Sequence, residues 1–177
     1  MILEKLKTIE KSINSELSSK IQNTTINHKE LLIEIDEKDL IDVVQFLKSN
    51  ENCRFRQLID IAGADYPEDE KRFELIYLFL SHEHNTRIKL LIKFQLNQTI
   101  NSITKIFSSA NWMEREVFDM YGIKFKNHPD LRRILTDYGF KGHPLRKDFP
   151  LTGFNEVRYS EKDKKVIYEP VKLEQNY

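Results

Sequence analysis

The sequence is poor in cysteine and carries no net charge, and each of these features excludes a class of protein. Its 177 residues include a single cysteine, Cys53, so no disulfide can form within the chain. One thiol also cannot hold an iron–sulfur cluster, which takes about four ligands. The 28 basic and 28 acidic side chains cancel, which argues against a strongly basic nucleic-acid-binding protein.

Long apolar runs are absent as well. None approaches the ~20 residues of a membrane span, and the longest candidate is Leu75–Leu80. The first residues, MILEKLKTIEKSINSEL, mix acidic and basic side chains and lack the apolar stretch of a signal peptide. We therefore expect neither a secreted nor a membrane-spanning protein, but one that faces the cytosol.

Glycine and proline are scarce in the first part of the chain. Residues 1–62 contain neither, whereas four of the five glycines and four of the five prolines lie at or after position 122. Regular elements are therefore expected first, followed by a stretch with many turns.

Hydrophobic periodicity predicts a mixture of helices and strands before residue 122. Steps of three and four between apolar residues predict helices, and alternation or short apolar runs predict strands. Helices are expected over about residues 2–21, 40–47 and 100–110, and strands over 31–35, 73–80 and 87–94. We therefore predict an α+β fold, a two-layer sandwich of a small, mainly antiparallel sheet with helices, over residues 1–122.

A further helix is expected near the end of this domain. Asn111 and Glu114 form a capping-box pattern, so the helix would run from Trp112 to Tyr121. Gly122 is well placed to end it in a left-handed conformation.

The remaining residues, 123–177, are predicted to form an extended C-terminal arm. Residues 123–154 are dense in aromatics, arginines and turn residues but follow neither period for more than a few positions. Such a stretch cannot build a core alone, so it must lie on its own domain or on a partner. We favour a partner, because arginine and aromatic side chains are enriched in stable interfaces.

Charged side chains are the candidates for partner contacts. A guanidinium binds a carboxylate through two parallel hydrogen bonds, although Asp130 or Asp148 could satisfy the arginines internally. Arg115 and Asp119 lie one helical turn apart and can pair, which favours a structural network over a catalytic acid cluster. The predicted partner-binding residues are Arg115, Asp119, Arg132, Arg133, Arg146, Lys147 and Asp148.

Neither a catalytic residue nor a metal site is predicted. His82 and His84 lie two positions apart, but no third ligand is evident. His128 and His143 each precede a proline, where a structural role is favoured over proton transfer.

Two consecutive stretches resemble a known family. NWMEREVFDMYGIKFKNHPDLRRIL (residues 111–135) followed by GHPLRKDFPLTG (142–153) is similar to the thirty-kilodalton subunit family of respiratory complex I. In bacteria this family is the C subunit of NADH-quinone oxidoreductase. The tail RYSEKDKKVIYEPVKLEQ (158–175) also resembles it.

The resemblance implies a non-catalytic, peripheral-arm subunit of the proton-translocating NADH-quinone oxidoreductase, one that scaffolds the quinone-reducing module. Members of this family pack against the quinone-module subunit of the forty-nine-kilodalton type and lie near the subunits with the last iron–sulfur clusters. They hold no cofactor, because flavin, clusters and quinone belong to other subunits. The implied location is the cytoplasmic face of the bacterial inner membrane, with only indirect membrane contact and no nucleic acid. The alternative is an equivalent scaffold in a membrane-bound hydrogenase or a ferredoxin- or quinone-linked dehydrogenase.

Overall fold

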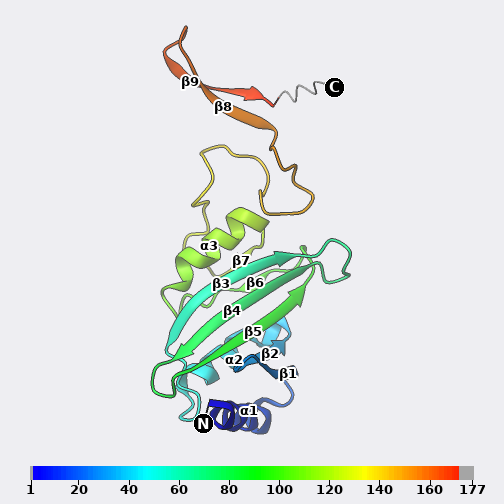
Figure 1. Cartoon of the computed structure of the whole chain (residues 1–177), viewed down its shortest axis with the longest axis vertical. Helices are drawn as coiled ribbons and strands as arrows, with labels where there is room; N and C mark the ends of the chain where they lie inside the picture. The colour runs from blue at the N-terminus through cyan, green and yellow to red at the C-terminus, as the bar shows by residue number, and fades with distance from the viewer. Residues whose placement is uncertain (1, 172–177) are drawn as a thin grey trace.

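The computed structural model describes residues 2–171, so residue 1 and the last residues of the predicted arm, 172–177, lie outside the described part. Figure 1 shows an α+β domain from which the end of the chain projects as a hairpin. The elements are α1 (Ile2–Leu17), β1 (Ile21–Asn27), β2 (Glu30–Ile35), η1 (Glu37–Asp39), α2 (Leu40–Ser49), β3 (Gln57–Asp65), β4 (Phe73–Ser81), β5 (Thr86–Phe94), β6 (Ile100–Asn101), α3 (Ala110–Tyr121), β7 (Phe125–Lys126), β8 (Asn155–Ser160) and β9 (Lys165–Pro170).

The domain is built on a five-stranded sheet with the strand order β1-β2-β5-β4-β3. Its pairings are antiparallel except for β2 and β5, which run parallel from Leu31 opposite Ile88 to Ile35 opposite Ile92. Burial alternates along β4, where every second residue from Phe73 to Ser81 is buried. This period of two presents one apolar face of the sheet.

All three helices pack into one core with that face of the sheet. α1 contributes Leu6, Ile9 and Ile13, α2 contributes the buried stripe from Leu40 to Leu47, and α3 contributes Val117. Burying a large apolar side chain fully stabilises a fold by about 1.5–3 kcal/mol. The predicted α+β fold is confirmed, and the core continues past residue 122 through Ile123 and Phe125.

Two predicted helices are wrong in extent or in kind. The first stops at Leu17, not near residue 21, and is followed by a turn and by strand β1. Serine is a poor helix former, and β1 is rich in the β-branched residues that favour strands. Residues 100–110, predicted as helix, instead begin with β6, where the N–H of Ile100 donates to Lys124 at 3.0 Å. The apolar spacing there marks burial along β6 and a series of turns, in which the N–H of Phe107 donates to the carbonyl oxygen of Ile103 at 2.9 Å but no α-helix forms before α3.

Helix α3 begins at Ala110, two residues before the predicted start. Its N-cap is Ser109, whose side chain makes no capping bond. The predicted capping box is wrong, because the Glu114 carboxylate accepts a hydrogen bond from the N–H of Ile103 at 2.8 Å. Glu114 therefore ties the helix to the segment after β6.

Gly63 on β3 lets α3 approach the sheet closely. A Cβ atom at this position would lie 2.8 Å from the ring of Tyr121. We expect Gly63→Ala to lower the free energy of unfolding by about 1–3 kcal/mol, measured by urea denaturation, because overpacking displaces the helix. In a Tyr121→Leu background the same change should cost little. An equal cost in both backgrounds would show that the ring contact is not the cause.

Candidate partner-docking site

The predicted arm divides into two parts with different surroundings. Residues 127–149, here called the latched segment, are hydrogen-bonded to α3 and to the β3 edge of the sheet. Strands β8 and β9 form the terminal hairpin, which stands away from the domain (Figure 1).

Asp119 is the main anchor of the latched segment. Its fully buried carboxylate accepts the backbone N–H groups of Ile134, Leu135 and Thr136 at 3.0, 2.8 and 2.9 Å. It also accepts the Thr136 hydroxyl at 2.7 Å and the Arg133 guanidinium at 2.8 Å. Burial alone would raise the pKa of Asp119, but the hydrogen bonds from Thr136, Ile134 and Leu135 hold that pKa well below its usual range. The ionised side chain therefore fixes a whole turn of chain onto α3.

Arg115 does not pair with Asp119, so the predicted pair within the helix is wrong. Its guanidinium instead donates to the carbonyl oxygens of Arg132 and Arg133 at 2.9 and 3.0 Å. Donors from the latched segment occupy the Asp119 carboxylate, and Arg115 bonds carbonyl groups of the same turn. Both side chains of the predicted pair thus hold residues 132–136.

The latched segment also completes the end of α3. Gly122 ends the helix with a φ of 79°, as predicted for a left-handed cap. The last carbonyl groups of a helix lack partners within it. Here Nδ1 of His143 lies 2.9 Å from the carbonyl oxygen of Asp119, and the N–H of Leu145 donates to Met120 at 3.1 Å. His143 therefore has a structural role at this helix terminus.

A second anchor holds the segment to the edge of the sheet. The buried Asp65 carboxylate at the end of β3 accepts two hydrogen bonds from Arg72, at 2.6 and 2.8 Å, and the N–H of Lys147 at 2.7 Å. Arg72 also reaches Asp148 at 3.0 Å, and Arg146 binds the same carboxylate at 2.9 and 2.6 Å. The arginines hold the pKa of both carboxyls below the usual range. This network connects the root of the hairpin to the sheet.

Most of the predicted partner-binding residues are thus engaged within the chain. Arg115, Asp119, Arg133, Arg146 and Asp148 all make the internal contacts described above. The side chain of Arg132 pairs with Asp130 at 2.8 Å, and both are exposed. The Lys147 side chain is exposed, although its N–H is bound. Contact of these residues with a partner stays a prediction.

The terminal hairpin carries an apolar surface that was not predicted from the sequence. On one face Val157 lies opposite Tyr168, and Tyr159 lies opposite Val166. These side chains are 52–60% exposed. The other face carries Glu156, Arg158 and Lys165 together with the half-buried Ile167. Alternation of apolar and polar residues along 155–160 was the available signal. An isolated two-stranded hairpin is marginally stable in water, so this exposed apolar face is a candidate docking surface.

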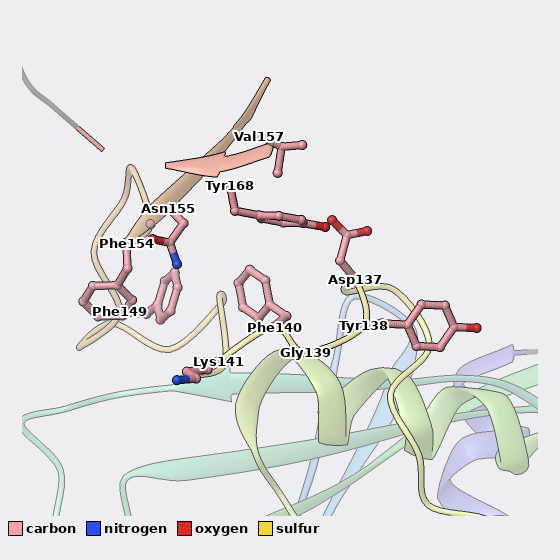
Figure 2. Close-up of a pocket in the computed structure, with 11 residues that line it drawn as sticks. Asp137, Tyr138, Gly139, Phe140, Lys141, Phe149, Phe154, Asn155, Val157 and Tyr168 are labelled. Atoms are coloured by element: carbon pink, nitrogen blue, oxygen red, sulfur yellow. The ribbon is translucent and has the colours of Figure 1, made fainter. Parts of the chain in front are cut away.

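A cleft of about 560 Å³ lies between the hairpin and residues 137–141 and 149 of the latched segment (Figure 2). Phe140 and Phe149 meet at 5.8 Å between ring centroids, and Phe149 meets Phe154 at 5.3 Å. The aromatic residues that line the cleft are Tyr138, Phe140, Phe149, Phe154 and Tyr168. The apolar face of the hairpin therefore continues into an aromatic depression.

Glu114 and His128 form a separate, buried group. Both side chains are fully buried, with Oε2 of Glu114 lying 3.8 Å from Nε2 of His128. That oxygen and the buried Tyr77 hydroxyl make no hydrogen bond with any part of residues 2–171. Burial raises the pKa of Glu114 to about 7, and the Ser102 hydroxyl and the Ile103 N–H oppose this only in part. Because no substrate can reach this pair without opening of the core, it does not support an acid–base enzyme.

The other candidate ligands lie apart. Nε2 of His82 contacts Oε1 of Gln57 at 2.7 Å, whereas Nε2 of His84 contacts the carbonyl of Glu51 at 3.1 Å. Among residues 2–171, no group of three or more histidine, cysteine and acidic side chains is placed to hold a metal ion. Within the same range, no helix has the length and apolarity needed to cross a membrane.

Comparison with known proteins gives a consistent result. A family model described as respiratory-chain NADH dehydrogenase, 30 kDa subunit, matches residues 33–155. The chain is 56% identical over 148 residues to the NADH-quinone oxidoreductase C subunit of Ruegeria pomeroyi, covering 84% of this chain and 74% of that protein. Proteins of the same name from Chelativorans sp. and Rhodospirillum rubrum are 47% and 49% identical. These alignments cover 98% and 99% of this chain and 87% and 82% of the relatives. The similarity thus extends over the domain and the latched segment.

Proposed function

The chain belongs to the family of the 30 kDa subunit of respiratory-chain NADH dehydrogenase, and from that membership we propose that it is the C subunit of a proton-translocating NADH-quinone oxidoreductase. In this role it is a non-catalytic subunit of the peripheral arm that scaffolds the quinone-reducing module. The names of its relatives favour this function over the equivalent scaffold of a hydrogenase or a ferredoxin-linked dehydrogenase.

The observation that carries the scaffold role is the exposed apolar face of the terminal hairpin, held out on a firmly anchored root. The double anchor at Asp119 and Asp65 fixes where the hairpin begins, so little freedom is lost at its root on association. We assign the quinone-module subunit of the forty-nine-kilodalton type and the neighbouring iron–sulfur subunits as the partners. They would hold this chain at the cytoplasmic face of the bacterial inner membrane.

The redox groups belong to other subunits in this proposal. Burial raises the pKa of Cys53 to about 12, so its thiol is poorly suited to ligate a cluster as a thiolate. No donor set for a cluster is otherwise present among residues 2–171. In this proposal the chain contributes to electron transfer only by holding the neighbouring subunits in their relative positions.

Purification of the chain from native membranes tests the proposal. We expect a tagged copy to co-purify with the quinone-module subunit and the iron–sulfur subunits, in a fraction that transfers electrons from NADH to quinone. Recovery of the chain alone, or with the electron-input subunits of a hydrogenase, would contradict the assignment.

The apolar face of the hairpin should be needed for assembly. The double variant Tyr159→Ser/Val166→Ser removes two facing side chains that are 52% and 57% exposed. We expect it to lower the fraction of the chain in the purified complex about tenfold or more, because less apolar area would then be buried on association. Native gels of solubilised membranes measure this fraction.

The matched control lies on the opposite face of the same hairpin. Glu156→Ser/Lys165→Ser alters two exposed polar residues and should leave assembly close to the unaltered level. Equal effects of the two double variants would show that docking does not use the apolar face.

A further inference from the structure

We propose that the cleft beneath the terminal hairpin binds an arginine side chain presented by an apolar segment of a partner subunit. This inference rests on the proposed function and specifies the chemistry of the surface that docks. The lining comprises aromatic rings, one carboxylate, Asp137, and one ammonium group, Lys141, together with Val157 and Tyr168 from the hairpin (Figure 2).

The aromatic lining suits a cation. Ring faces carry partial negative charge and attract a guanidinium within about 6 Å of the ring centroid. The chain already uses this contact internally, because the guanidinium of Arg133 lies 5.9 Å from the centroid of Phe140. Tyr168 and Phe154 line the cleft, and both residues are at least 60% exposed. An arginine entering from outside would thus meet rings that still have free surface.

Asp137 supplies the opposite charge. The other two carboxylates of the latched segment, Asp130 and Asp148, are both bound by arginines. The carboxylate of Asp137 is exposed and makes no hydrogen bond or ion pair with any side chain in residues 2–171. Figure 2 shows the phenol of Tyr168 directed toward the side of the cleft on which Asp137 lies. One acidic group thus remains available beside the rings.

The shape and flanks of the cleft favour arginine with apolar neighbours. A volume of about 560 Å³ exceeds the space of a single side chain, so adjoining residues of the partner can enter with it. The apolar pair Tyr159 and Val166 extends the surface along the hairpin. A planar guanidinium stacks on rings and binds a carboxylate through two hydrogen bonds, which a lysine ammonium cannot do. Lys141 also lines the cleft, but Figure 2 shows it on the other side of Phe140 from Asp137, so a cation can approach Asp137 on the acidic side.

Site-specific photo-crosslinking in the purified complex tests the inference. A photoreactive p-benzoylphenylalanine at position 138, which is fully exposed and lines the cleft, should label one peptide of a partner subunit. We expect the labelled peptide to contain an arginine next to apolar residues. Asp137→Asn should reduce the crosslink yield about tenfold, because the charge-assisted bonds are lost. Asp130→Asn, in the same segment but outside the cleft, should leave the yield unchanged.

A charge exchange completes the test. Asp137→Arg should abolish the crosslink, and replacement of the labelled arginine by aspartate in the partner should restore it. Labelling of a peptide without a basic residue, labelling of lipid, no labelling of an intact complex, or a yield insensitive to Asp137→Asn would each overturn the inference. In those cases the chain would still be found in the complex, whereas its absence from the complex would contradict the proposed function itself.

Discussion

Replacing Asp119 by alanine is expected to release residues 133–136 from helix α3 and to lower the free energy of unfolding by about 3–5 kcal/mol, since it leaves buried partners of a charged group unpaired. In the parent, the Arg133 guanidinium and three backbone N–H groups donate to this carboxylate, and the variant removes their acceptor. Urea denaturation measures the loss, and limited proteolysis should show new cleavage within the latched segment. The complex should lose this subunit, because the hairpin would no longer have a fixed root.

Asp130→Ala is the matched control for this prediction. Asp130 also pairs with an arginine, Arg132, but both side chains are exposed. An exposed pair of this kind contributes about 0–1 kcal/mol. The pH dependence offers a second check: because the pKa of Asp119 is lowered, its contribution is complete above the ordinary value of 3.8 and is lost as the pH falls below it. Similar losses for Asp119→Ala and Asp130→Ala would mean that burial and multiple hydrogen bonds add nothing at position 119.

Replacing Glu114 by glutamine should stabilise the protein at alkaline pH. Burial raises the pKa of Glu114 from 4.5 to about 7, so the folded chain holds a proton that the unfolded chain releases. Its stabilising effect is complete below pH 4.5 and declines as the pH rises through 7. The stabilisation that is lost between these two pH limits is on the order of 3 kcal/mol. Glutamine retains an oxygen to accept the Ile103 N–H and carries no charge. We therefore expect the variant to exceed the parent by about 2–3 kcal/mol at pH 8.

Urea denaturation between pH 5 and pH 8 measures this effect as the difference between variant and parent, which removes the contribution of all other titrating groups. The control is Glu116→Gln, which makes the same chemical change on the exposed side of the same helix. A constant difference for Glu114→Gln across this range would show that Glu114 is already ionised in the folded protein at pH 5.

The local pattern of apolar residues was sufficient to predict the two central strands of the sheet. The apolar runs at 73–80 and 87–94 coincide with β4 and β5 to within one residue at each end, because adjacent antiparallel strands leave a local signal. The parallel pairing of β2 with β5 joins residues more than fifty positions apart, and no local pattern specifies such a neighbour. Strand β1 was missed because its exposed polar positions dilute the alternation.

The candidate site was predictable in composition but not in connectivity. Arginines and acidic residues of the arm were identified as a recognition set, and Asp148 was named as a possible internal partner, which the structure confirms through Arg146. The role of Asp119 was not predicted, because its donors lie 14–17 residues away along the chain. Helical spacing pointed only to Arg115. The sequence predicted only an extended arm where the structure has the hairpin. The turn at residues 160–165 contains no glycine or proline, so the sequence gives no sign of it.

The exposed face of the terminal hairpin has a consequence for unassembled copies of the chain. Chaperones and proteases act on apolar segments that a folded protein leaves uncovered, and a free copy displays Val157, Tyr159, Val166 and Tyr168 together. Docking would hide the same four side chains. Cellular quality control can therefore distinguish a surplus copy from an assembled one by this surface alone, which would couple the abundance of the subunit to that of its neighbours.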